Sequence, residues 1–125
     1  MTSVDPVILE QRVRNRIIEC LELFASATET SIIGPDAAMN LWYDFVPKWS
    51  ADAFPSPTYS GAEREAVRLV HEAVDLAARS TPDPLPSVPE LMLNPSWQLL
   101  MDSSEAALRE FRKRGKLSEE TPASD

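Results

Sequence analysis

The sequence predicts an all-α protein, a single-domain bundle of about four helices with a proline-rich crossover before the last helix. Three observations support this prediction. Apolar residues recur at helical spacing in four long segments, capping residues followed by proline or glutamate mark the helix starts, and no alternating pattern is long enough to indicate a strand. The length of 125 residues suits one domain of common size.

The first helix is expected near residues 6–27. Asp5 is a good capping residue, and Pro6 suits the first helical position because the N–H that proline lacks would have no partner there. The apolar positions form one stripe at helical spacing: Leu9, Val13, Ile17, Cys20, Leu21 and Phe24. This helix is therefore predicted to be amphipathic, with the stripe in the core.

A shorter second helix is expected near residues 35–46. It follows Gly34 and must end by Val46, because Pro47 disfavours helical geometry in the residue before it. Its apolar side is formed by Ala38, Met39, Trp42, Phe45 and Val46. The next segment, 47–59, contains three prolines and is predicted to be a long, partly extended loop.

The third helix, near residues 61–80, begins with Ser60 and Glu63 at the spacing of a capping box. Its predicted buried stripe consists of small and β-branched residues: Ala66, Val67, Val70, Ala73, Val74 and Ala77. Four prolines follow, at positions 82, 84, 86 and 89. They predict a rigid, extended crossover to the last helix.

The last helix, near residues 95–114, has the clearest signals. Asn94 can cap it, Pro95 suits its first position, and Gly115 suits the residue just past its end. The predicted buried stripe is Trp97, Leu100, Met101, Ser104, Ala107, Leu108 and Phe111. The polar tail, residues 115–125, is expected to fray and remain flexible.

The charge of the chain limits its partners. Twenty acidic and twelve basic residues give a formal net charge of −8. Because binding to nucleic acid rests on neutralising phosphates, this charge argues against nucleic acid as the main partner. Residues 17–63 contain seven acidic residues against Lys48 alone. The basic run at 109–116 is interpreted as a cationic last turn that the helix dipole favours.

The sequence lacks the motifs of metal sites and of phosphate-binding loops. One histidine and one cysteine cannot build a zinc site of the usual kind, and three glycines exclude a glycine-rich loop. Cys20 is expected to be an inert core thiol. No cofactor, no metal and no membrane partner are therefore predicted. Without a signal-peptide pattern or a long apolar run, the expected location is the cytoplasm.

One pair of residues suggests an enzyme as the alternative. Arg64 and His71 lie seven positions apart on the third helix, which resembles the arginine and histidine pair of HEPN-type helical ribonucleases. The resemblance implies a metal-independent RNase in which His71 is the acid or base and Arg64 holds phosphate. The structural alternative is a surface imidazole that pairs with Glu72 or Asp75.

Aromatic residues gather around the 47–59 loop. Six of the nine aromatics in the chain lie between positions 42 and 59. Either they attach the loop to the bundle, or they anchor a partner within an acidic surface. For the second interpretation, the candidate partner-binding residues are Tyr43, Asp44, Trp49, Asp52, Phe54 and Tyr59, with Glu29 and Asp36 beside them.

The charge and the aromatic residues together favour a small acidic protein-binding module. The hypothesis is an immunity- or antitoxin-like inhibitor that occludes a basic partner protein, such as a toxin nuclease. In such an inhibitor, acidic residues speed association and aromatic anchors slow dissociation. The alternatives are a helical enzyme and a structural or adaptor subunit. The apolar edge at Val7 and Ile8 also leaves a homodimer open.

Overall fold

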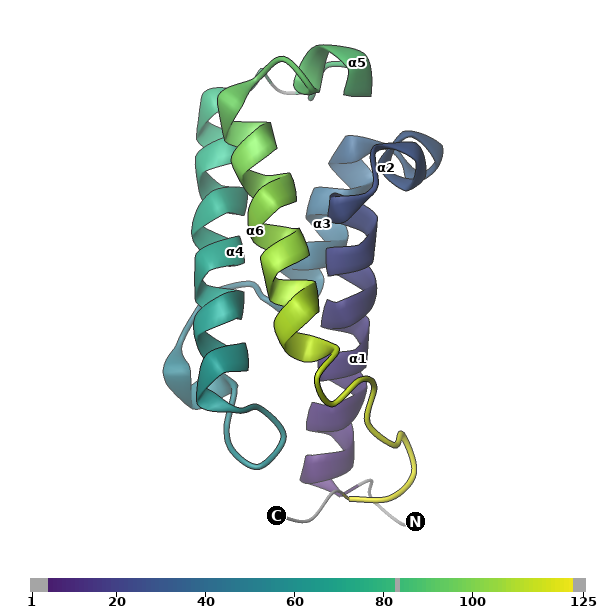
Figure 1. Cartoon of the computed structure of the whole chain (residues 1–125), viewed down its shortest axis with the longest axis vertical. Coiled ribbons are helices and arrows are strands. Elements are labelled where there is room, and N and C mark those ends of the chain that lie inside the picture. Colours follow the sequence, from purple (N-terminus) through teal and green to yellow (C-terminus); the bar gives the residue numbers. More distant parts are fainter. Residues whose placement is uncertain (1–4, 83, 123–125) are drawn as a thin grey trace.

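The computed structural model describes residues 5–82 and 84–122, and every regular element within these ranges is helical. Four long helices alternate in direction along the bundle (Figure 1). They are α1 (Pro6–Ala25), α3 (Pro35–Phe45), α4 (Gly61–Ser80) and α6 (Pro95–Phe111). α6 packs against both α4 and α1, so it is the central helix of the bundle. The predicted all-α bundle is confirmed in this general form.

The number of helices differs from the prediction because short helices are added at the connections. They are α2 (Ala27–Ile33), the 3₁₀ helix η1 (Ala51–Ala53) and α5 (Val88–Leu91). Ser26 ends the first predicted helix early, since its backbone is extended and its hydroxyl accepts a hydrogen bond from the Glu29 N–H at 3.1 Å. α2 and α5 lie at the same end of the bundle (Figure 1).

The predicted apolar stripes form most of the core. Phe24 joins three helices there, since its ring centroid lies 6.1 Å from Trp42 on α3 and 6.3 Å from Trp97 on α6. All predicted stripe residues of the four long helices are buried except Leu9, which is exposed, and Val13, Phe45, Ala66 and Met101, which are partly buried. Helical spacing therefore predicted correctly which side of each helix faces inward.

The loop between α3 and α4 is attached to the bundle by its own aromatic residues. Phe54 and Tyr59 are 2% and 1% exposed, and their rings pack edge to face with centroids 5.2 Å apart. Trp49 is partly buried against the core. The prediction that Phe54 and Tyr59 could anchor a partner is therefore wrong, because burial removes both side chains from the surface.

The chain after α6 also differs from the prediction. The helix ends at Phe111, before the predicted residue 114, and Gly115 takes a left-handed φ of 73° as expected beyond a helix end. The segment that follows does not fray within the described residues. It runs along α1 (Figure 1), where Asn15 both donates to the Leu117 carbonyl and accepts from its N–H, at 2.8 and 3.0 Å. Residues 123–125 lie outside the described part.

Candidate functional site

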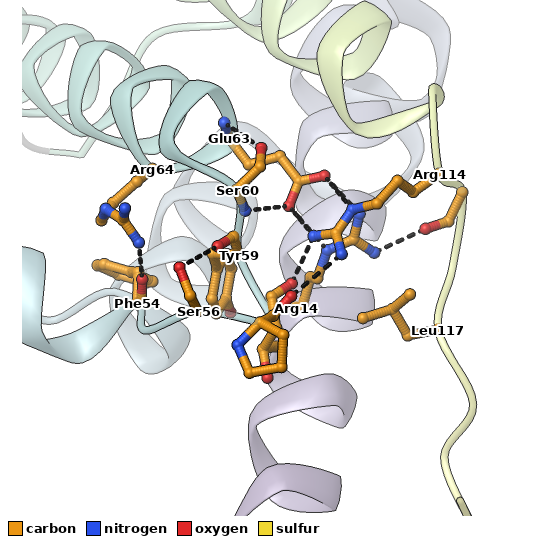
Figure 2. A network of polar contacts seen from close by, with 12 residues as sticks. Arg14, Phe54, Ser56, Tyr59, Ser60, Glu63, Arg64, Arg114 and Leu117 are labelled. Carbon is orange, nitrogen blue, oxygen red and sulfur yellow. Dashed lines mark hydrogen bonds and ion pairs between the residues drawn. The ribbon is translucent and has the colours of Figure 1, made fainter. Parts of the chain in front are cut away.

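A buried ion cluster joins three distant parts of the chain (Figure 2). Arg14 on α1 has a fully buried side chain and pairs with Glu63 on α4 at 2.9 Å. Arg114, beyond the end of α6, also binds the Glu63 carboxylate, with its Nε 3.0 Å from Oε2. Arg14 further donates to the Gly115 carbonyl at 2.6 Å and lies 4.9 Å from the Phe111 ring centroid.

Every group in this cluster has partners, which indicates a structural role. Burial alone raises the pKa of the Glu63 carboxyl, but hydrogen bonds from Arg114, Arg14 and the Ser60 N–H outweigh burial and hold the pKa below its usual value. Arg114 also donates to the Thr58 carbonyl at 2.6 Å. The carboxylate therefore stays charged and holds α1, α4 and the C-terminal segment together.

The two residues of the candidate ribonuclease pair make contacts to different parts of the chain. Arg64 donates to the Phe54 carbonyl at 2.7 Å and so helps to fix the loop. His71 is 8% exposed, and its Nδ1 accepts a hydrogen bond from the Trp42 indole N–H at 3.1 Å. Its Nε2 lies 3.6 Å from Asp75. Both side chains thus make structural contacts, and His71 connects α4 to α3.

Cys20 lies in the core, as expected from its place on the apolar stripe. Burial, followed by the nearby charges of Glu19 and Asp44, raises the pKa of the Cys20 thiol to about 12. A protonated, buried thiol is a poor nucleophile. In the part of the chain that the structure describes, no group of three or more His, Cys, Asp or Glu side chains is placed to hold a metal ion.

The structure separates the predicted partner-binding residues into different places. Asp44 and Asp52 are exposed on α3 and η1, and Glu29 is exposed on α2. Tyr43 is partly buried, and its hydroxyl donates to Asp75 at 2.5 Å. Asp36 accepts a hydrogen bond from the Leu85 N–H at 3.2 Å. With Phe54 and Tyr59 in the core, the eight residues do not form one surface.

An acidic groove lies where α1, α2 and α6 meet. Its volume is about 660 Å³, and four carboxylates line it: Glu19, Glu22, Glu29 and Glu105. Two arginines also line it: Arg109 on α6 and Arg112 just past the end of that helix. Glu19 is paired with Arg16 and Lys116, whereas Glu22, Glu29 and Glu105 form no ion pair within residues 5–82 and 84–122. Beyond the ion pairs of Glu19, the groove therefore has three carboxylates against the two arginines.

A smaller apolar groove adjoins the acidic groove between α1, α2 and α3. It measures about 340 Å³ and shares Glu19 and Glu29 with the acidic groove. Ile33 and Leu41 line it with 49% and 38% of their surface exposed. Asp44 is close enough to affect the thiol of Cys20, which also lines this groove. Apolar side chains here are therefore bordered by carboxylates.

The aliphatic residues of this apolar groove were not among the residues predicted from the sequence to bind a partner. Ile33, which lines the groove, follows Ile32 and precedes Gly34 at the end of a short helix, and Leu41 lies on the flank of α3, about 100° around the helix from the buried Trp42. Two isoleucines before a helix-ending glycine were a usable signal, because a helix that short cannot bury both. The predicted binding surface was placed around the 47–59 loop instead, because aromatic residues gather there.

Comparison of the chain with protein-family models, with curated proteins and with solved structures gives no match. Among the helices of the described residues, none combines the length and apolar character needed to cross a bilayer.

Proposed function

We propose that this protein is a small acidic binding module, an immunity- or antitoxin-like inhibitor that acts in the cytoplasm and occludes a basic partner protein such as a toxin nuclease. The observation that most supports the proposal is the acidic groove beside the apolar groove at the α1–α2 corner. Cationic side chains of the partner pair with Glu22 and Glu29, while an apolar side chain enters beside Ile33 and Leu41.

The physical basis is a division of roles between charge and apolar contact. A net charge of −8 attracts a cationic protein over distances beyond contact and raises its association rate. Burial of apolar surface at Ile33 and Leu41, which are 49% and 38% exposed in the free chain, slows dissociation. The aliphatic residues of the apolar groove thus take the role that the sequence analysis assigned to Phe54 and Tyr59.

The test is affinity capture with the full chain from a lysate of the source organism, followed by mass spectrometry. We expect a basic protein to be retained at about 0.1 M salt and lost at about 1 M, because the screening length falls from about 10 Å to about 3 Å. The double variant Glu22→Gln/Glu29→Gln should lose the captured protein at low salt as well. Both residues are exposed, so the fold should be unchanged.

The matched control is Glu90→Gln/Glu120→Gln, which removes the same charge at exposed positions outside both grooves at the α1–α2 corner. This control should retain the partner. Equal capture by the wild type and by both double variants would rule out the acidic groove as the binding site. Equal loss in both double variants would show that net charge alone, without a defined surface, accounts for binding.

A further inference from the structure

The outward face of the α4–α6 pair contains a second apolar surface, separate from the proposed binding site. The two helices run antiparallel (Figure 1), and two hollows of about 400 and 410 Å³ lie along them. Leu69 and Ser103 line both hollows and form the ridge between them. Three exposed leucines lie here: Leu69 at 47%, Leu76 at 36% and Leu99 at 46%.

The residues along this face, which we call the α4–α6 groove, have the spacing of a helix-packing seam. On α4 the steps alternate between four and three residues through Ala62, Ala66, Leu69, Ala73 and Leu76, and α6 continues the pattern with Leu99, Ser103 and Ala106. Such spacing places large side chains against hollows of a facing helix. The core residues Val67, Val70 and Val74 lie on the adjacent side of α4, and Ala73, which is 3% exposed, belongs both to the core and to the lining of the groove.

We propose that the α4–α6 groove is the interface of a homodimer, in which a second copy packs its own α4 and α6 against this face with two-fold symmetry. A two-fold interface must be complementary to itself, because both copies use the same patch. The groove meets this requirement, since it has projecting leucines and hollows lined by alanines. Leu69, on the ridge between the hollows, lies near the two-fold axis.

The charges along the groove favour a second copy in antiparallel orientation. One hollow is lined by three carboxylates: Glu65, Asp102 and Glu110. Glu65 pairs with Arg68 and Glu110 pairs with Lys113 in the same copy, so Asp102 is the carboxylate of this hollow that forms no ion pair within the described residues. The other hollow contains Arg79, near the C-terminal end of α4, which forms no ion pair within the described residues. A two-fold axis at the ridge brings Arg79 of each copy toward the carboxylate-lined hollow of the other.

Two further carboxylates in the Arg79 hollow already have partners within the same copy. Glu72 accepts a hydrogen bond from Arg68 at 2.6 Å, and Asp75 accepts one from Tyr43 at 2.5 Å. Arg79 is therefore the charge in this hollow that is left for the second copy. The arrangement gives two equivalent sets of opposite charges, one at each end of the dimer interface.

The first test is sedimentation velocity of the full chain over a range of concentrations. We expect the apparent molecular mass to rise with protein concentration, from that of a monomer to twice that value. Leu69→Glu should weaken self-association at least about tenfold, because it places a charge at the centre of the interface. The control Leu93→Glu changes a residue that is 85% exposed and outside the groove, so it should leave the mass curve unchanged.

A monomer at every concentration, or equal effects of the two leucine variants, would overturn the proposal. Circular dichroism of Leu69→Glu separates lost association from lost folding. If Ile33→Glu abolished the dimer while Leu69→Glu did not, the interface would lie at the α1–α2 corner and the proposal would be wrong. Glu22→Gln/Glu29→Gln should leave the dimer intact, so failure of this proposal and of the proposed function are distinguishable.

Cross-linking provides a second test that does not depend on weakening the dimer. In a Leu69→Cys variant, the new thiols of the two copies should be joined efficiently by a short bismaleimide, because Leu69 lies near the two-fold axis. Cys20 does not compete, since it is 4% exposed. A Leu93→Cys control should remain uncross-linked, and equal cross-linking of the two variants would contradict the placement of the axis.

Discussion

Glu63 combines a local and a long-range role in one side chain. Locally, it completes the capping box at the start of α4, because its carboxylate accepts from the Ser60 N–H and its own N–H donates to the Ser60 hydroxyl. Over a longer range, the same carboxylate pairs with Arg14 and Arg114, which lie 49 and 51 positions away. The capping box was predictable from spacing alone. The two arginines were not, since charge partners so distant follow no local pattern.

At this scale we predict that Glu63→Gln lowers the free energy of unfolding by about 3–5 kcal/mol, because it leaves the buried guanidinium of Arg14 without its counter-charge. The control Glu90→Gln removes an exposed carboxylate away from the cluster and should have little effect. Chemical denaturation of both variants measures the difference. Equal stability of the two variants would show that the cluster does not hold the bundle together.

The pH dependence follows from the lowered pKa of the Glu63 carboxyl in the folded state. A group whose pKa is lower when folded stabilises the protein above its unfolded pKa, and this contribution is lost as the pH falls through the folded pKa. The loss should therefore begin below about pH 4.5, the ordinary pKa of the group. Glu63→Gln should flatten this part of the stability curve measured by thermal unfolding.

The C-terminal segment shows how an element without regular structure is held in place. Its backbone is bonded by side chains of α1: Asn15 binds Leu117, Gln11 donates to the Ser118 and Thr121 carbonyls, and Arg12 donates to the Glu119 carbonyl. The polar composition of the segment predicted a frayed tail. The informative residues are polar residues of α1 such as Gln11 and Asn15, which are 0% and 1% exposed and bind this segment.

For this element we predict that Asn15→Ala lowers the free energy of unfolding by about 2 kcal/mol, since several hydrogen bonds of a buried amide are lost. The Leu117 amide should also lose its protection from hydrogen exchange. Glu120→Ala, an exposed change in the same segment, should alter neither quantity. Fast exchange of the Leu117 amide in the wild type would mean that the segment is not attached to α1.

At the scale of the whole molecule, α6 is the helix on which the arrangement depends. Its inner stripe fills the core, one flank lines the acidic groove through Glu105 and Arg109, and the other flank lines the α4–α6 groove through Leu99 and Ala106. A homodimer would therefore carry two acidic grooves, one on each copy. The location of both proposed surfaces follows from the central position of this helix.

Because one core joins the long helices, we predict that the bundle unfolds in a single cooperative step. Trp42 and Trp97, which are 0% and 1% exposed, report the core by near-ultraviolet circular dichroism, and the far-ultraviolet signal reports the helices. The two denaturant curves should coincide. Loss of the tryptophan signal at lower denaturant than the helical signal would contradict a shared core.

The sequence by itself determined where the four long helices lie and which side of each faces inward. Spacing, caps and prolines act between residues a few positions apart, so they are readable before folding, as the stripe of α6 from Trp97 to Phe111 demonstrates. Only the tertiary structure decided how Arg14, Glu63 and Arg114 meet, that Phe54 and Tyr59 enter the core, and which carboxylates share a groove. These outcomes depend on packing between distant segments, whose three-dimensional geometry no local pattern encodes.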